Sequence, residues 1–332
     1  MVEVRVGAGT VRGAVESGVR VFRGIPFAAA PVGELRFAAP RPVPPWDGVR
    51  DALEFGPPPP QAQVFGMDGV GVAGDEWLTV NVWSPDLGGG LPVMVWIQGG
   101  AYTIGTSGLP EYDGTRLALD GVVVVTFNYR VGVEGFAQLE GAPANRGLLD
   151  QVAALEWVRA EISAFGGDPG RVTVFGQSAG GGSVAALLAM PRAAGLFQRA
   201  IASSVPGTFF TPELAADIAS VCAAELGLRP TAADLSTVDP ALLPVAGDEV
   251  MAQIGRFTGR WGQAAHKKIP FAPVVDGDVL PVAPWEALAA GAARDVELVA
   301  GHTRSEQRLL TIIEGVFGTV TAAQAAQAAE VF

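Results

Sequence analysis

The chain of 332 residues has 22 basic and 34 acidic side chains, a formal net charge of −12, and 49% of its residues are apolar. These values exclude a disordered chain and a protein that binds nucleic-acid phosphates, and no apolar run reaches the roughly 18 residues of a membrane span. One cysteine and two histidines allow neither an internal disulfide nor a zinc centre, so we expect a cytoplasmic globular protein without metal or cofactor.

The first 90 residues are expected to form strands and a proline-rich meander that packs onto a core. Residues 1–6 alternate between apolar and polar side chains, as a half-buried strand does. No helix pattern follows the glycine-rich segment Gly7–Gly13, which predicts a hairpin turn rather than a dinucleotide site. Aromatic residues interrupt the prolines of residues 40–60, and this favours packing over a free linker.

Three strands are predicted in residues 91–205. Val93–Ile97 and Val122–Asn128 are continuous apolar runs, as expected for strands that are buried on both faces. Arg171–Phe175 is a further short strand. Their alternation with helices indicates a doubly wound, mostly parallel sheet with helices on both faces.

Two helices are predicted between and after these strands. Apolar residues at helical spacing predict a helix over Gly147–Phe165, and Asn145 stands where its N-cap is expected. The apolar segment Val184–Met190 predicts a second helix, which Pro191 would end.

The signal is weaker over residues 206–332. Pro212–Leu226 is predicted to be a helix capped by Thr211, and Thr321–Gln324 forms a capping box that would open another helix. Residues 227–265 are expected to be irregular. The remaining predicted elements are the strands Ile269–Val275 and Val296–Ala300 and the short helix Pro284–Ala290.

The segment Gly176-Gln-Ser-Ala-Gly180 lies between a predicted strand and a predicted helix. A sharp strand-to-helix turn holds such a serine in a strained conformation and leaves no room for side chains two residues before and after it. Ser178 would then stand at a helix N-terminus, where backbone N–H groups favour developing negative charge. This context favours a nucleophilic serine; the alternatives are an ordinary glycine-rich turn and a phosphate loop.

A second loop supports the nucleophile interpretation. Gln98-Gly99-Gly100-Ala101 follows the strand Val93–Ile97 and is able to turn bare N–H groups toward Ser178. Donors of this kind stabilise an oxyanion where charge develops in the transition state. Taken alone, a glycine pair after a strand is an ordinary turn.

With these motifs and several longer blocks, the chain resembles the type-B carboxylesterases, which include the cholinesterases. The resemblance extends from about residue 2 to the end and implies an α/β-hydrolase fold in a single domain with three parts, residues 1–90, 91–205 and 206–332. The blocks are Phe22–Phe27, Pro31–Phe37, Trp46–Arg50, Leu78–Pro85, Phe127–Arg130 and Asn145–Gly181, the longest, which contains the serine turn.

The resemblance also implies roles for individual residues. Ser178 matches the nucleophile, and Gly99, Gly100 and Ala179 match the donors of the oxyanion hole. Glu306, in a segment similar to the family's acid loop, becomes the candidate acid; by itself it would be interpreted as a solvated charge. No cofactor is implied, and the expected ligand is a small uncharged carboxylic ester rather than a nucleic acid or a membrane.

Several positions depart from the family's pattern. The family usually has histidine and glutamate where this chain has Gln98 and Gln177, and many relatives have a half-cystine where it has Trp77. Bacterial relatives commonly have an acidic and an aromatic residue beside the acid, where this chain has Ser305 and Gln307. Both histidines, His266 and His302, precede Glu306, whereas the family's catalytic histidine follows its acid. We therefore expect a chain that is incomplete at its C-terminus and impaired in hydrolysis by itself.

Two functions remain open. The first is a serine carboxylesterase, present here as a fragment or as one part of a split protein, in which the missing histidine takes the proton of Ser178 and an acyl-enzyme forms. In this chain alone, His302, four residues before Glu306, or His266 would have to substitute for that histidine. The second is a non-catalytic partner protein with a drifted site, open to association through the exposed sheet edge at Val296–Ala300. Five aromatic residues line an acyl pocket or belong to the core: Tyr102, Phe136, Phe209, Phe210 and Trp261.

Overall fold

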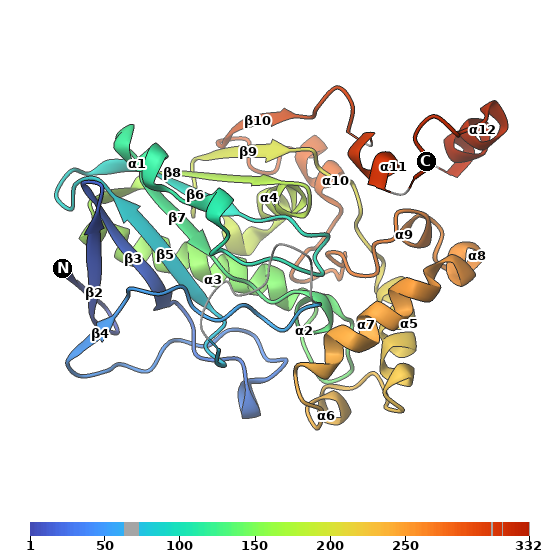
Figure 1. The fold of residues 1–332 in the computed structure, drawn as a ribbon, viewed down its shortest axis with the longest axis horizontal. Coiled ribbons are helices and arrows are strands. Elements are labelled where there is room, and N and C mark those ends of the chain that lie inside the picture. The colour runs from blue at the N-terminus through green and yellow to red at the C-terminus, as the bar shows by residue number, and fades with distance from the viewer. Residues whose placement is uncertain (63–72, 307, 314, 332) are drawn as a thin grey trace.

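The computed structural model describes residues 1–62, 73–306, 308–313 and 315–331 (Figure 1); Gln307 lies outside the described residues. Ten strands of the described residues form one sheet. They are β1 Val2–Val6, β2 Gly9–Glu16, β3 Val19–Pro26, β4 Val49–Asp51, β5 Thr79–Ser84, β6 Leu91–Ile97, β7 Val123–Phe127, β8 Gly167–Gln177, β9 Arg199–Ser203 and β10 Glu297–Gly301.

The sheet has an antiparallel half and a parallel half. Its order is β1-β2-β3-β5-β7-β6-β8-β9-β10, and β4 pairs with β2. The neighbours from β1 to β7 pair antiparallel, whereas β7, β6, β8, β9 and β10 run parallel. In the parallel half, Ile97 pairs with Gly176 and Gln177 with Ser203. The carboxyl ends of β6, β8 and β9 therefore meet at one edge, which is where the candidate site lies.

Helices cover both faces of this sheet, as predicted. The helices α3 and α4 pack against β8 and β6 on one face, and α1 packs against β3, β5 and β7 on the other (Figure 1). The helices are α1 Thr115–Leu119, α2 Gly132–Phe136, α3 Arg146–Glu161, α4 Ala179–Ala189, α5 Pro212–Glu225, α6 Ala232–Leu235, α7 Leu242–Gln253, α8 Thr258–Trp261, α9 Gln263–His266, α10 Pro284–Ala289, α11 Arg308–Ile313 and α12 Ala322–Val331. Short 3₁₀ helices are Gly33–Leu35, Pro110–Tyr112, Ile162–Phe165, Pro191–Ala193 and Ile254–Phe257.

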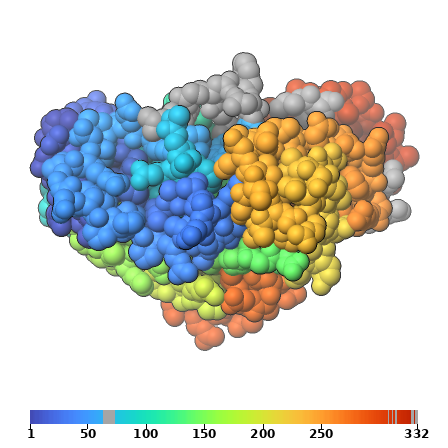
Figure 2. All heavy atoms as spheres, turned by 90° about the horizontal axis from the view of Figure 1, so that it is seen from below, coloured from blue at the N-terminus to red at the C-terminus, as the bar shows by residue number. Residues whose placement is uncertain are grey.

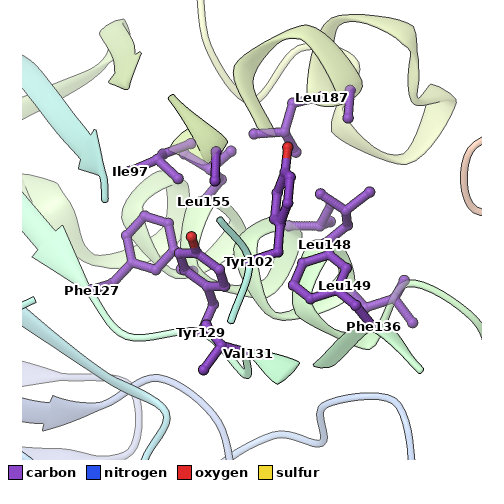
Figure 3. Close-up of a cluster of buried hydrophobic side chains, with 14 of the residues drawn as sticks. Ile97, Tyr102, Phe127, Tyr129, Val131, Phe136, Leu148, Leu149, Leu155 and Leu187 are labelled. Carbon is purple, nitrogen blue, oxygen red and sulfur yellow. The ribbon is translucent and has the colours of Figure 1, made fainter. Parts of the chain in front are cut away.

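The main core lies between the sheet and the helices α3 and α4. Ile97 and Phe127 from the strands meet Leu148 and Leu155 from α3 and Leu187 from α4 (Figure 3). Each of these side chains is at most 1% exposed. Burying one side chain of this size stabilises a fold by roughly 1.5–3 kcal/mol, so this cluster holds α4 firmly against the ends of the parallel strands.

A buried ion pair fixes α3 beside the carboxyl end of β7. Arg130 and Asp150 are both fully buried, and the guanidinium donates two hydrogen bonds of 2.8 Å to the carboxylate. The Arg130 amide donates a third, of 3.0 Å, to the same carboxylate. A buried charge is tolerated only when it is paired in this way.

A second buried ion pair joins the N-terminal meander to the helical region. Arg36 contacts Glu134 of α2 at 2.8 Å, with both side chains nearly inaccessible, and also donates to the carbonyl of Val238. Figure 2 shows the N-terminal residues, in blue, packed directly beside the yellow and orange helices of residues 212–266. Burial raises the pKa of Glu134, and the nearby arginines oppose that shift.

Several predictions of local structure are confirmed. The segment after β1 turns into β2 as an antiparallel hairpin. Thr211 caps α5 by accepting a hydrogen bond of 3.3 Å from the Leu214 amide. At the start of α12, Thr321 and Gln324 form the expected reciprocal capping box.

Asn145 is the N-cap residue of α3, as predicted, but its side chain does not cap the helix. Asn145 adopts a left-handed conformation with φ of 56° and makes no side-chain cap. Its amide instead bonds both the N–H and the carbonyl of Val274, each at 2.7 Å. The side chain thus serves a long-range contact that replaces the local one.

Two predictions in the C-terminal part are wrong. Residues 227–265 contain the helices α6 to α8, the 3₁₀ helix Ile254–Phe257 and the start of α9 rather than irregular chain. Ile269–Val275 forms no strand, and its one β-bridge joins Val274 to Phe210. Pro270 and Pro273 remove two amide donors from this segment, so it cannot build a regular ladder.

Strand β10 is present as predicted and pairs with β9 (Figure 1). It ends the strand order of the sheet, and Leu298 and Val299 are 44% and 63% exposed. The expected open edge is therefore found in the described residues, while its association with another chain stays a prediction. None of the described helices has the length and apolar character needed to cross a membrane.

Candidate active site

Ser178 occupies a strained turn between β8 and α4. Its φ of 57° and ψ of −123° lie where residues with side chains are rarely found. The two glycines of the motif are required by close packing. A Cβ added at Gly176 would lie 2.5 Å from the carbonyl carbon of Gly180, and one added at Gly180 would lie 2.0 Å from the Ile97 oxygen. The predicted strand, sharp turn and helix are confirmed.

The surroundings of Ser178 favour negative charge beside its side chain. Ser178 is the N-cap of the 11-residue α4, and Ala179 is the first residue of that helix. The first amides of a helix have no partner within it and carry the positive end of its dipole. The Ser178 amide itself donates a 3.0 Å hydrogen bond to the Ser203 carbonyl at the end of β9, and Ser178 remains partly accessible.

The loop after β6 brings Gly99 against Ser178. A Cβ added at Gly99 would lie 3.4 Å from Ser178 Cβ and 2.7 Å from the Gln177 carbonyl oxygen, so only glycine fits. Within the described part of the chain, the amides of Gly99 and Gly100 donate to no backbone carbonyl. Gly99 and the serine are therefore neighbours, while the role of these amides as oxyanion donors stays a prediction.

Tyr129 orients the peptide of Gly99, the first of these candidate donors. Its hydroxyl, which is fully buried, donates a 2.7 Å hydrogen bond to the Gln98 carbonyl. The carbonyl and the N–H of a planar trans peptide point in opposite directions. Holding the Gln98 carbonyl therefore fixes the direction of the Gly99 N–H.

The two glutamines that depart from the family pattern have contrasting environments. Gln98 is fully buried, and both polar atoms of its amide lack a hydrogen-bond partner among the described residues. Gln177 is exposed. The neutral Gln98 side chain brings no charge to the loop after β6, residues 98–105, which is the candidate oxyanion loop.

Glu306 lies in the loop after β10 and is bonded to the end of β9. Ser204 Oγ donates to Glu306 Oε1 at 2.7 Å, and the Thr303 amide donates to the same oxygen at 2.5 Å. These hydrogen bonds, that of Ser204 first, lower the pKa of Glu306 below its ordinary value. The carboxylate is exposed in the described structure and stays ionised at neutral pH.

The two histidines lie in different elements. His302 belongs to the Glu306 loop, where its Nδ1 is 2.9 Å from the Thr303 carbonyl. His302 is the smallest of the causes that lower the pKa of Glu306, after the hydrogen bonds from Ser204 and Thr303. His266 is the last residue of α9 and is exposed.

Most of the aromatic residues considered for an acyl pocket belong to the core. Tyr102 points toward α4 (Figure 3), and a Cβ at Gly182 would lie 2.3 Å from its hydroxyl. Phe209 is half-buried and packs edge-to-face on Trp285 with ring centroids 5.8 Å apart. The fully buried members are Tyr102, Phe136, Phe210 and Trp261.

Sequence reasoning missed three residues that organise the site. Ser204 bonds the candidate acid Glu306, and Tyr129 bonds Gln98 in the candidate oxyanion loop. Gln61 bonds Gly105 at the far end of that loop. Ser204 and Gln61 carry no local signal, because their partners lie 102 and 44 residues away. Tyr129 belongs to Phe127–Arg130, one of the segments that carry the family resemblance, but the sequence alone indicated no role for it.

The comparisons with known proteins identify the family of the chain. The model of the carboxylesterase family matches residues 1–325. The para-nitrobenzyl esterase of Bacillus subtilis is 44% identical over 312 residues, which are 90% of this chain and 61% of that protein. The fumonisin B1 esterase of Sphingopyxis macrogoltabida is 39% identical over 92% of this chain and 56% of its own length.

Solved structures give the same result. A para-nitrobenzyl esterase structure has a TM-score of 0.82 at 42% identity and covers 92% of this chain and 64% of its own. A carboxylesterase from Geobacillus stearothermophilus has a TM-score of 0.86 at 38% identity, over 98% of this chain and 66% of its own. The chain spans about three fifths of the length of the curated relatives. Its fold is that of the α/β-hydrolases, and the chain belongs to the carboxylesterase family.

Proposed function

We propose that this protein hydrolyses small carboxylic esters with Ser178 as the nucleophile. The observation that carries the proposal is the strained Ser178 at the N-terminus of α4, with Gly99 packed against its side chain. The named relatives include a para-nitrobenzyl esterase and a fumonisin B1 esterase. The described residues belong to one domain in this proposal, because a single buried cluster extends from Val4 to Ala287.

In the proposed reaction, Ser178 Oγ attacks the ester carbonyl and a base takes its proton. The amides of Gly99, Gly100 and Ala179 donate to the oxyanion that forms, and removing one such donor typically costs ~10²–10³ in kcat. The tetrahedral species expels the alcohol and leaves an acyl-enzyme. Water then releases the carboxylic acid and restores Ser178.

The base determines how fast these 332 residues react by themselves. In hydrolases of this fold the histidine follows the acid in the chain, whereas His266 and His302 both precede Glu306. Removing the histidine of a serine protease triad lowers kcat on the order of a millionfold. We therefore propose slow hydrolysis, with His302, which lies in the Glu306 loop, as the first candidate base.

Hydrolysis of para-nitrophenyl butyrate by the purified chain tests the proposal. We expect slow release of nitrophenol that Ser178→Ala abolishes and that Ser220→Ala, a change on the exposed face of α5, leaves unaltered. A tenfold loss in His302→Ala, with no change in His266→Ala, would assign the base. Release that persists in Ser178→Ala would contradict the proposal, and no release from the folded chain would favour the non-catalytic partner protein.

A further inference from the structure

The side chain of Gln61 is bonded to both polar backbone groups of Gly105. Gln61 Nε2 donates to the Gly105 carbonyl at 3.0 Å, and the Gly105 amide donates to Gln61 Oε1 at 2.8 Å. The same Nε2 also donates to the Pro59 carbonyl at 3.2 Å. Gly105 is buried and Gln61 half-buried, so this pair of hydrogen bonds is partly protected from competition by water.

Gly105 in turn lies against the Gly99 carbonyl. A Cβ added at Gly105 would be only 2.9 Å from the Gly99 oxygen, and Gly105 has φ of +137°, which favours glycine. The Gly99 carbonyl and the Gly100 N–H belong to one planar trans peptide and point in opposite directions. The position of Gly105 therefore limits the direction of the Gly100 N–H, much as Tyr129 fixes that of Gly99.

The segment that carries Gln61 is itself anchored. Asn128, just after β7, donates to the Pro57 carbonyl at 3.0 Å and accepts from the Ser107 amide at 2.7 Å. The buried Asn128 side chain thus joins the segment at Pro57 to the segment at Ser107. Gln61, four residues after Pro57, joins the same two segments through Gly105. Gln61 therefore bonds Gly105 from a segment that is itself held by Asn128.

We propose that Gln61 is a positioning residue of the oxyanion hole. Through Gly105 it holds the Gly99–Gly100 peptide in the orientation that turns the Gly100 amide toward the developing charge on a substrate bound at Ser178. Gln61 does not itself touch the reacting atoms. The proposal rests on the proposed function, because it assigns a role within the same serine hydrolase site.

The test follows covalent labelling of the full chain by an alkyl fluorophosphonate. Phosphonylation of Ser178 expels fluoride and develops negative charge on the phosphoryl oxygen, so its rate depends on the oxyanion donors. We expect Gln61→Ala to lower the maximal labelling rate by about tenfold to a hundredfold with an unchanged half-saturating concentration. Gln253→Ala, a change in a glutamine at the end of α7, should leave both unchanged.

Gln61→Glu separates positioning from a loss of folding. Its carboxylate still accepts from the Gly105 amide but repels the Gly105 carbonyl, whereas the protonated acid restores one donor and one acceptor. We expect its labelling rate, divided by the wild-type rate at the same pH, to rise toward one as the pH falls below about 5. This variant carries the test if Gln61→Ala does not fold.

The outcomes distinguish this proposal from the proposed function. Equal labelling rates in wild type and Gln61→Ala would overturn the role of Gln61 and leave Ser178 as the nucleophile. A changed half-saturating concentration with an unchanged maximal rate, or a Gln61→Glu ratio that is independent of pH, would also overturn it. A folded wild-type chain that is not labelled would overturn both proposals.

Discussion

Ser204 Oγ donates a 2.7 Å hydrogen bond to Glu306 Oε1, although the two residues are 102 positions apart. The Ser204 amide donates to the Gly301 carbonyl at 2.8 Å, and the preceding Ser203 carbonyl accepts from the Ser178 amide. The end of β9 therefore joins the serine turn to the loop of the candidate acid. These contacts link the segments of the candidate nucleophile and the candidate acid directly, and none of them involves residues 227–296.

Ser204→Ala is predicted to raise the pKa of Glu306, because the hydrogen bond from Ser204 is the largest cause of its lowering. A lowered carboxyl pKa favours the folded state above the unfolded-state value of about 4.3, and that contribution is lost as the pH falls through the folded-state pKa. As the pH falls, the Ser204→Ala variant should lose this stabilisation at a higher pH than the wild type does. Titration of ¹³C-labelled glutamate by NMR, assigned with Glu306→Gln, measures the shift.

The control for this titration is Ser305→Ala. Ser305 is the chain neighbour of Glu306, but the hydroxyl that donates to Glu306 Oε1 belongs to Ser204. The Glu306 pKa of Ser305→Ala should equal that of the wild type. An unchanged pKa in Ser204→Ala would contradict the assignment of the lowered pKa to the Ser204 hydrogen bond.

Gly180→Ala is predicted to destabilise the fold. The new methyl group would lie 2.0 Å from the Ile97 carbonyl oxygen, which is part of a central strand and cannot move aside cheaply. Overpacking of this kind costs about 1–3 kcal/mol, and urea denaturation should show a lower free energy of unfolding. Gly255→Ala is the matched control, because an added Cβ there meets nothing within 4 Å; equal losses in both variants would contradict the steric account.

Asp150→Asn is predicted to cost about 3–5 kcal/mol of unfolding free energy, because it leaves the fully buried Arg130 charge without its counterion. Glu297→Gln, which breaks the exposed pair with Arg199, should cost at most about 1 kcal/mol. Thermal and urea unfolding of both variants measure the difference. Similar losses in the two variants would refute the distinction between buried and exposed pairs.

The sequence is most informative where local geometry requires particular residues. The Ser178 turn could be predicted because Gly176 and Gly180 are the only residue type that fits there, and the apolar runs of β6 and β7 mark strands buried on both faces. The Thr211 cap of α5 is equally local. Fold class and candidate nucleophile were therefore accessible without a structure.

Long-range contacts account for the errors and omissions. Asn145 has the residue type of an N-cap, but its amide is bonded to Val274, 129 residues away. The apolar run Ile269–Val275 suggests a strand, yet its burial comes from loop packing. Glu306 could be chosen only from the family resemblance, because nothing in its own neighbourhood distinguishes it from a solvated charge.

The central claim, that Ser178 is an activated nucleophile, is tested most directly by intact mass spectrometry after treatment with a fluorophosphonate. The account predicts one adduct per chain, located on the peptide that contains Ser178 and absent from Ser178→Ala. A folded chain that gains no adduct, or an adduct that persists in Ser178→Ala, would contradict it.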